Sequence, residues 1–391
     1  MASDAFAGRL AAADARLDDL EALCANATDP ACCPLAAGIR DGVPIYECRD
    51  LRGRMAVDHR FVDRLAAEWS AIWHAGPGIV VLTQAFESAA VVDAVTERFR
   101  AIIDAERQSQ SGGDHFAKAG ANDRVWNALE KLCLADPELF ARYYGNDMIA
   151  LASQAWLGPG YQVTSQVNNV RPGGAAQMPH RDYHLGFCTA AQAERFPARV
   201  HRLSPLLTLQ GAVAHVDMPL ESGPTLYLPH SQKYRYGYLV AERDEFRAYF
   251  DRHRVQLPLR KGDAVFFNPA LIHAAGTNSS RDIQRIANLL QVSSVFGRAM
   301  ESVDRDRMTR VLYPHLQRLV ATDALQRDAV ARVVAASAEG YAFPTNLDRD
   351  PPLGGLAPES PAAVVLRALD ESWPAERLFL RLDEMRLKRM P

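Results

Sequence analysis

The sequence predicts an α+β fold in which helices at both ends of the chain brace a central β-barrel. Apolar residues recur at helical spacing up to about residue 156, and the same spacing returns after Phe296. Between them lie β-branched segments separated by turn residues, the pattern of a barrel. A chain of 391 residues with 48% hydrophobic content is long enough to bury a large core.

Three regions follow from this pattern. We expect an N-terminal helical extension over residues 1–77 and a barrel core with bracing helices over residues 78–298. A C-terminal helical extension, residues 299–391, should pack on that core.

The individual elements are read from hydrophobic spacing and turn residues. Helices are expected at residues 2–25, 57–73, 89–107, 125–133, 137–156, 304–320, 322–337, 361–370 and 376–390. Strands are expected at residues 78–82, 161–170, 206–216, 264–267 and 283–296, with a short one around His180. Loops are expected at residues 26–50 and 108–113.

Candidate metal ligands stand in a fixed order along the barrel region. His180-Arg181-Asp182 follows a strand and a Gly-rich turn, and His273 comes just after the short strand at residues 264–267. Side chains of a strand repeat every two residues, so His180 and Asp182 should share one face. Two imidazoles and one carboxylate are the ligands that non-haem Fe(II) oxygenases use.

A second pair, His215-Val216-Asp217, competes with the first. With 11 histidines and 47 acidic residues in the chain, roughly one such pair is expected by chance. The competing pair ends a long apolar stretch and could also supply two ligands from one strand face. However, the only later histidine at a matching barrel position is His273, which follows Asp217 by just 56 residues, so this pair is the second choice.

An arginine follows the distal histidine. On the strand at residues 283–296, Arg285 shares a face with Ala287, Leu289 and Gln291. Burying an unpaired charge is costly, so an arginine on this inward face should have an anionic partner.

In this order the motifs resemble the phytanoyl-CoA dioxygenase family, over roughly residues 79–295. The stretches at residues 221–225 and 228–231 also resemble the family's Gly-rich turn and the loop after it. The resemblance implies a double-stranded β-helix (a jelly-roll or cupin-like barrel), Fe(II) bound by His180, Asp182 and His273, and 2-oxoglutarate bound by Arg285. It also favours the His180 pair over the His215 pair, because the family's metal pair precedes the Gly-rich turn by about forty residues.

The resemblance implies an oxidoreductase, with Fe(II) as metal and 2-oxoglutarate and O2 as cosubstrates. A dioxygenase of this kind hydroxylates or otherwise oxidises an unactivated C–H bond of a small organic substrate and releases succinate and CO2. Related halogenases carry Gly or Ala at the carboxylate position, so an intact Asp182 favours hydroxylation over halogenation.

Further contacts are expected on both sides of the metal pair. Gln166 and Asn168 lie where relatives place amides that contact 2-oxoglutarate, although ordinary polar strand residues would look the same. Tyr183 and His184 follow the metal pair directly and are expected to line the substrate pocket.

The chain departs from the family pattern at two positions. Ala275 stands where many relatives carry a Ser or Thr for the cosubstrate carboxylate, and Arg285 follows His273 with one residue more than usual. Thr277 is a candidate for the missing hydroxyl, and Arg281 is an alternative anchor.

Three other functions fit the sequence less well than an oxygenase. A helical zinc pair of His180 and His184 is disfavoured by Pro179 and by the lack of His-Glu-x-x-His. A barrel that binds metal or ligand without oxygenating, such as a sensor or scaffold, would not need the full ligand set. A cupin-type hydrolase would need further histidines on the same strands.

Composition narrows the class of partner. A net charge of −3 gives no electrostatic case for nucleic acid or an anionic membrane, and no apolar run reaches the length of a membrane span. Four of the six cysteines lie between residues 24 and 48 without metal-site spacing, and no signal peptide precedes them. We therefore expect a cytoplasmic enzyme with a small-molecule substrate; the sequence does not indicate an oligomeric state.

Overall fold

Two β-sheets form the centre of the computed structural model, which describes residues 8–109, 122–186 and 188–391. The large sheet has the strand order β1-β2-β3-β9-β6-β11-β5-β4, and the small sheet has the order β10-β7-β8. The strands are β1 (Gly38–Arg40), β2 (Val43–Glu47), β3 (Ile79–Thr83), β4 (Asn122–Val125), β5 (Gln162–Val170), β6 (Thr208–Ala214), β7 (Leu226–Tyr227), β8 (Val255–Gln256), β9 (Ala264–Phe267), β10 (His273–Ala274) and β11 (Arg285–Ser293).

The chain passes back and forth between the two sheets from β5 onward. β5, β6, β9 and β11 are antiparallel neighbours in the large sheet, while β7, β8 and β10 form the small one. His180 adds a further bridge to His273 at the edge of the small sheet. This alternation is the topology of a double-stranded β-helix, so the predicted α+β barrel is confirmed.

The inner face of the large sheet lines a cavity between the sheets. On β11, Arg285, Ala287, Leu289 and Gln291 all line it, which is the face that the sequence predicted. The alternate residues of β11 point to the other side, because side chains change face at every residue of a strand. On that side Ile286, Leu290 and Val292 join the main hydrophobic core.

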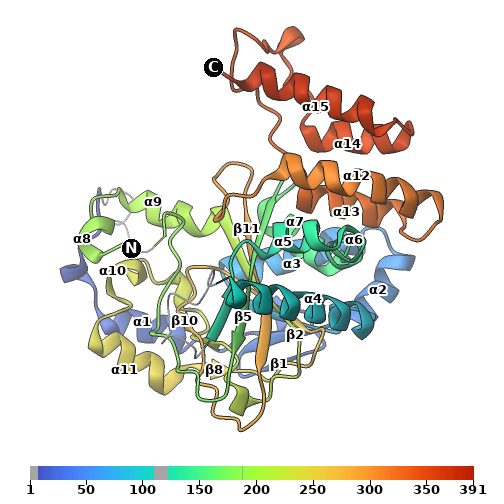
Figure 1. Ribbon diagram of the computed structural model, residues 1–391. Helices are drawn as coiled ribbons and strands as arrows, with labels where there is room; N and C mark the ends of the chain where they lie inside the picture. The colour runs from blue at the N-terminus through green and yellow to red at the C-terminus, as the bar shows by residue number, and fades with distance from the viewer. Residues whose placement is uncertain (1–7, 110–121, 187) are drawn as a thin grey trace.

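Helices cover the outer face of the large sheet, on the right in Figure 1. They are α2 (Cys48–Val57), α3 (Phe61–His74), α4 (Ala89–Gln108), α5 (Ala128–Ala135), α6 (Pro137–Tyr144), α7 (Asp147–Leu157), α12 (Arg305–Ala321) and α13 (Arg327–Ser337). Their apolar sides bury large residues such as Trp69 and Trp73 against the sheet. Beyond α12 and α13 lie α14 (Pro361–Asp370) and α15 (Ala375–Arg389), where the sequence predicted helices.

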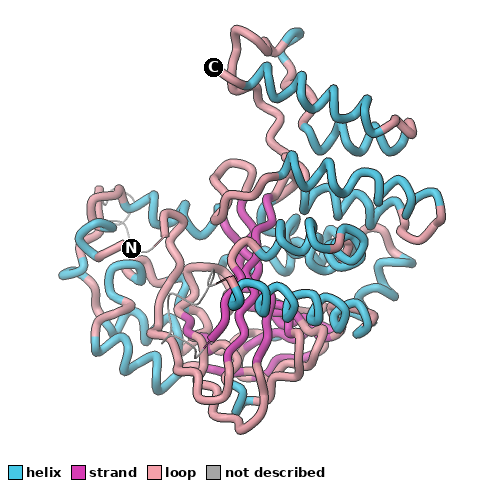
Figure 2. The backbone as a smooth tube through the Cα atoms, in the orientation of Figure 1, coloured by secondary structure: helices cyan, strands magenta, loops and turns pink. Residues whose placement is uncertain are grey.

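A second group of helices covers the small sheet, on the left in Figures 1 and 2. They are α1 (Leu17–Cys24), α8 (Ala190–Ala193), α9 (Ala198–Leu203), α10 (Gly237–Val240) and α11 (Asp244–His253). Residues of α1, α10 and α11 share a separate hydrophobic cluster with Leu226 and Ala274 of the small sheet. None of the helices in the described part of the chain is long and apolar enough to cross a membrane.

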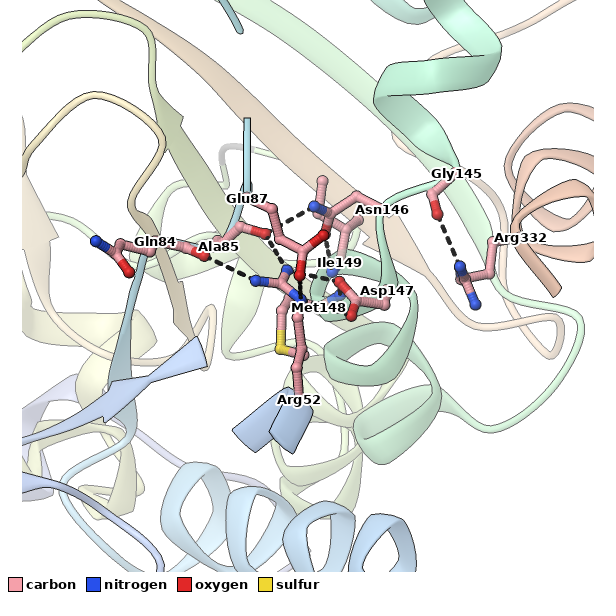
Figure 3. Close-up of polar contacts among 10 residues, drawn as sticks. All are labelled: Arg52, Gln84, Ala85, Glu87, Gly145, Asn146, Asp147, Met148, Ile149 and Arg332. Carbon is pink, nitrogen blue, oxygen red and sulfur yellow. Dashed lines mark hydrogen bonds and ion pairs between the residues drawn. The ribbon is translucent and has the colours of Figure 1, made fainter. Parts of the chain in front are cut away.

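The helix predicted at residues 137–156 is instead two helices, α6 and α7, and Figure 3 shows the contacts at their junction. The Asn146 side chain accepts a hydrogen bond from the Ile149 N–H and caps α7. Asp147 accepts two hydrogen bonds from Arg52, at 2.7 and 2.8 Å. The Arg332 guanidinium donates to the Gly145 carbonyl at 2.7 Å, so tertiary contacts hold the break in place.

Other predicted elements near the N-terminus also differ from the structure. The loop expected at residues 26–50 contains β1 and β2, and the helix expected at residues 125–133 begins only after the strand β4. β1 and β4 are the edge strands of the large sheet, and β2 lies next to β1. All three strands are short, and so few residues carry little alternation. Residues 2–7 and 110–113 of the predicted helix and loop lie outside the described residues. The boundaries at 77/78 and 298/299 stay predictions.

Candidate active site

Three side chains that the sequence singled out meet in the barrel. His180 and His273 exchange backbone hydrogen bonds of 3.0 Å, which places the two segments side by side. The Asp182 carboxylate lies 3.8 Å from His180 Nε2 and 3.7 Å from His273 Nε2. One ligand atom from each residue lies within 4.8 Å of the others, a spacing at which they could hold one metal ion.

Neighbouring groups orient these three side chains for a metal. The Nδ1 atoms of His180 and His273 each lie 2.8 Å from a backbone carbonyl, of Met178 and Leu271. A carbonyl only accepts, so Nδ1 carries the proton and Nε2 keeps its lone pair for a ligand. Burial, with the nearby His180, lowers the pKa of His273 to about 4 and keeps that imidazole neutral.

Gln210 of β6 contacts the carboxylate directly, and the sequence analysis missed it. Its amide Nε2 donates to Asp182 Oδ2. Such a contact holds one carboxylate oxygen in a fixed direction, as partners of metal ligands commonly do. In the sequence, this role could have been inferred only from the presence of one amide residue, Gln210, within the apolar stretch at residues 206–216.

His215 of the competing pair lies on the other face of the large sheet, whereas Asp217 is exposed and accepts a hydrogen bond from the Lys261 N–H. His215 is buried, and its ring nitrogens lie 2.8 Å from the Thr96 hydroxyl and 2.9 Å from the Tyr143 hydroxyl. Burial lowers the pKa of His215 to about 3. It is a neutral core histidine with both nitrogens hydrogen-bonded, so no lone pair is left for a metal.

The cavity beside the triad has a volume of about 570 Å³, and Arg285 lines it. Arg285 is only 6% exposed and forms no ion pair with a carboxylate of the described residues. Its Nη1 donates a hydrogen bond of 3.3 Å to the Gly276 carbonyl. Burial lowers the pKa of Arg285 to about 10, so the side chain remains charged at neutral pH. A buried cation without an anion fits an acidic ligand.

Two hydroxyl side chains near Arg285 also line the cavity, and neither was predicted. Tyr227 of β7 is buried next to the Thr225 hydroxyl. Burial raises the pKa of Tyr227, so its hydroxyl is a neutral donor. Thr225 lies two residues earlier, whereas Ala275 presents only a methyl group. The sequence could have pointed to these two residues only because they lie at the end of, or just after, the loop at residues 221–225, which matches the family motif.

The two amides predicted on β5 also line the cavity. Gln166 Oε1 accepts a hydrogen bond of 2.9 Å from Arg124 of β4. The side-chain oxygen of Asn168, Oδ1, is buried and has no hydrogen-bond partner in the described chain. Arg124 lines the cavity too, and its charge contributes to the lowered pKa of Arg285. The structure therefore brings Gln166 and Asn168 together with the triad and Arg285.

Four other candidates lie outside the cavity wall. The Thr277 hydroxyl accepts a hydrogen bond from the Ala176 N–H, and Arg281 is exposed on the turn before β11. The Tyr183 ring stacks on His201 at 5.7 Å, and His184 Nδ1 lies 3.1 Å from the Thr208 hydroxyl. Tyr183 and His184 are held by contacts with His201 of α9 and with Ser204 and Thr208, because no strand continues after Asp182.

The sequence profile described as phytanoyl-CoA dioxygenase (PhyH) matches residues 76–287, just over half of the chain. The chain belongs to the phytanoyl-CoA dioxygenase family. It is a non-haem iron, 2-oxoglutarate-dependent dioxygenase, with Fe(II) as its metal and 2-oxoglutarate and O2 as cosubstrates. A search of curated proteins finds no significant match.

Solved structures similar to this phytanoyl-CoA dioxygenase family member include two α-ketoglutarate-dependent enzymes and one protein with 2-oxoglutarate (the same compound) bound. The epimerase SnoN from nogalamycin biosynthesis is 19% identical, with 61% of this chain and 84% of that chain covered and a TM-score of 0.41. The carbocyclase SnoK from the same biosynthesis is 20% identical, with 62% and 89% covered and a TM-score of 0.43. HygX from Streptomyces hygroscopicus, with nickel and 2-oxoglutarate bound, is 16% identical, with 58% and 87% covered and a TM-score of 0.41.

Proposed function

We propose that the protein hydroxylates, or oxidises in a related way, an unactivated C–H bond of a small organic substrate. In this proposal His180, Asp182 and His273 hold Fe(II), and Arg285 binds the distal carboxylate of 2-oxoglutarate. One observation carries the proposal: the oriented triad and a buried arginine without an anionic partner face the same cavity. Succinate and CO2 are the expected coproducts.

The donor set fits iron. Two neutral imidazole nitrogens and one carboxylate are the facial ligands of Fe(II) oxygenases, and they leave positions open for small ligands. When bound, the iron and 2-oxoglutarate supply the oxidising chemistry, while the protein orients the reactants. Because Asp182 is a carboxylate held by Gln210, it is available as a metal ligand, which favours oxygenation over halide binding.

The rest of the cavity fits the cosubstrate and a small molecule. The Tyr227 and Thr225 hydroxyls add neutral donors beside Arg285, and we assign them, with Gln166 and Asn168, to 2-oxoglutarate. Apolar side chains form much of the remaining wall, among them Trp126, Met178, Leu257, Leu259 and Met300. A volume of about 570 Å³ is typical of small-molecule sites, so the substrate is an organic molecule with apolar parts.

The test is succinate formation by the purified protein. Supplied with Fe(II), 2-oxoglutarate and ascorbate in air, the wild type should form succinate slowly alone and faster with a substrate. His273→Ala should abolish both rates, whereas the exposed His59→Ala should retain them. Metal-loaded wild-type protein that forms no succinate, or a His273→Ala variant as active as wild type, would overturn the proposal.

A further inference from the structure

Arg181 lies between two proposed metal ligands, yet its side chain is not in the cavity wall. Neighbours along a strand point to opposite sides, so Arg181 leaves the site that His180 and Asp182 face. It is only 7% exposed and makes no ion pair with a carboxylate of the described residues. Burying a lone guanidinium is costly, so space filling alone does not account for an arginine here.

The guanidinium binds two backbone carbonyls of one loop. Nη1 donates to the Tyr234 carbonyl at 2.8 Å, and Nη2 donates to the Ser231 carbonyl. The group also lies against Gly237, where a Cβ would stand 1.8 Å from the Arg181 Cζ. Charge-assisted hydrogen bonds are about twice as strong as neutral ones, so the loop is tied firmly to the ligand segment.

The same loop, residues 228–238, also binds the segment of the third ligand. The Ser231 hydroxyl accepts a hydrogen bond of 2.8 Å from the Ile272 N–H, one residue before His273. The Leu228 N–H donates to the Ile272 carbonyl at 2.9 Å. One loop therefore contacts the backbones of both ligand-bearing segments.

We propose that Arg181 is a positioning residue for the metal centre: it ties the His180–Asp182 segment to the loop at residues 228–238 and so sets these ligands relative to His273. This inference rests on the proposed function, because it assumes that the three side chains bind the metal. Arg181 does not touch the metal or substrate; it acts through the backbone that carries two ligands.

Arg305 is a matched control for a purely structural role. It is also buried, at 8% exposure, and also donates to two backbone carbonyls, of Ala336 and Val163. It begins α12 and joins that helix to β5 on the far side of the large sheet from the cavity. Arg305→Met should lower the melting temperature without changing metal affinity.

The test compares Mn(II) affinity with thermal stability in four variants. Mn(II) binding is followed by loss of the EPR signal of the free ion, and stability by the melting temperature of the metal-free protein. Arg181→Met should weaken Mn(II) binding by roughly 10- to 100-fold, the usual effect of losing a partner of a metal ligand. Arg181→Lys should fall between, because an ammonium lacks the fork that reaches both carbonyls.

Gly237→Ala keeps the arginine and tests its position. Alanine suits the first residue of α10, but its Cβ would displace the guanidinium, so Mn(II) binding should weaken while the helix is not disfavoured. This variant decides the matter if Arg181→Met does not fold. Arg181→Met or Gly237→Ala with wild-type Mn(II) affinity, or equal losses in Arg305→Met, would overturn the inference. If the wild-type protein binds no Mn(II), or if His273→Ala binds it as tightly as the wild type, the result would contradict the proposed function instead.

Discussion

Replacing Arg285 with methionine is expected to weaken 2-oxoglutarate binding without destabilising the ligand-free protein. Methionine fills a similar space, but it has neither the charge nor the donors of the guanidinium. In the ligand-free protein the substitution removes the 3.3 Å hydrogen bond to the Gly276 carbonyl and, within the described residues, no ion pair. The two effects therefore separate a cosubstrate anchor from a structural arginine.

The size of each effect follows from the surroundings of Arg285. Burial lowers its pKa to about 10, which corresponds to roughly 3 kcal/mol against the charged form. Removing that charge should therefore leave the free energy of unfolding unchanged or higher. Losing two charge-assisted hydrogen bonds to a carboxylate should cost roughly 3 kcal/mol, a rise of about 100-fold in the Kd for 2-oxoglutarate.

The assay is calorimetric titration of the Mn(II)-loaded protein with 2-oxoglutarate, together with the melting temperature of the apoprotein. Arg281→Met is the control, because Arg281 is exposed and was the alternative anchor in the sequence. It should bind 2-oxoglutarate as the wild type does. An Arg285→Met variant that binds 2-oxoglutarate within about threefold of wild type but melts several degrees lower would refute the reasoning.

Three further predictions concern other parts of the molecule. Gln210→Leu removes the donor to Asp182 and should weaken Mn(II) binding by roughly 10- to 100-fold, as titration would show; unchanged affinity would contradict that role. His215 has its pKa lowered to about 3, so below pH 6.5 the unfolded state takes up a proton that the folded state does not. Stability should thus fall by about 1.4 kcal/mol per pH unit between pH 6 and 4 from this residue, and urea unfolding of His215→Gln should show a correspondingly shallower pH slope. Arg52→Met removes the two hydrogen bonds that Asp147 accepts from Arg52 and should lower the free energy of unfolding by roughly 1–3 kcal/mol in urea, with Mn(II) affinity unchanged.

The barrel was predictable where one strand carried a long, regular pattern. β11 and its inward face follow from the two-residue period that places Arg285, Ala287, Leu289 and Gln291 on one face, and the short β9 from its flanking turns. The break at Gly145 was not found, because the residues on both sides favour a helix. Contacts from Arg52 and Arg332, far away in the sequence, hold that break.

The candidate site was predictable to the extent that motif order carried it. The triad and Arg285 lie on segments with recognisable spacing, and the structure places them at one cavity. Gln210 and Tyr227 were missed, because only the pairing of distant strands brings them there. Thr277 was the candidate to replace the hydroxyl missing at Ala275, but in the structure its hydroxyl accepts a hydrogen bond from the Ala176 N–H and does not line the cavity.

The most direct test of the proposed centre is an anaerobic titration of the protein with Fe(II) and 2-oxoglutarate. It follows the weak visible charge-transfer band of the iron chelate. The wild type should show the band, Asp182→Ala should lose it, and Asp217→Ala, from the competing pair, should keep it. A band that survives in Asp182→Ala, or disappears in Asp217→Ala, would contradict the assignment of His180, Asp182 and His273 as the iron ligands.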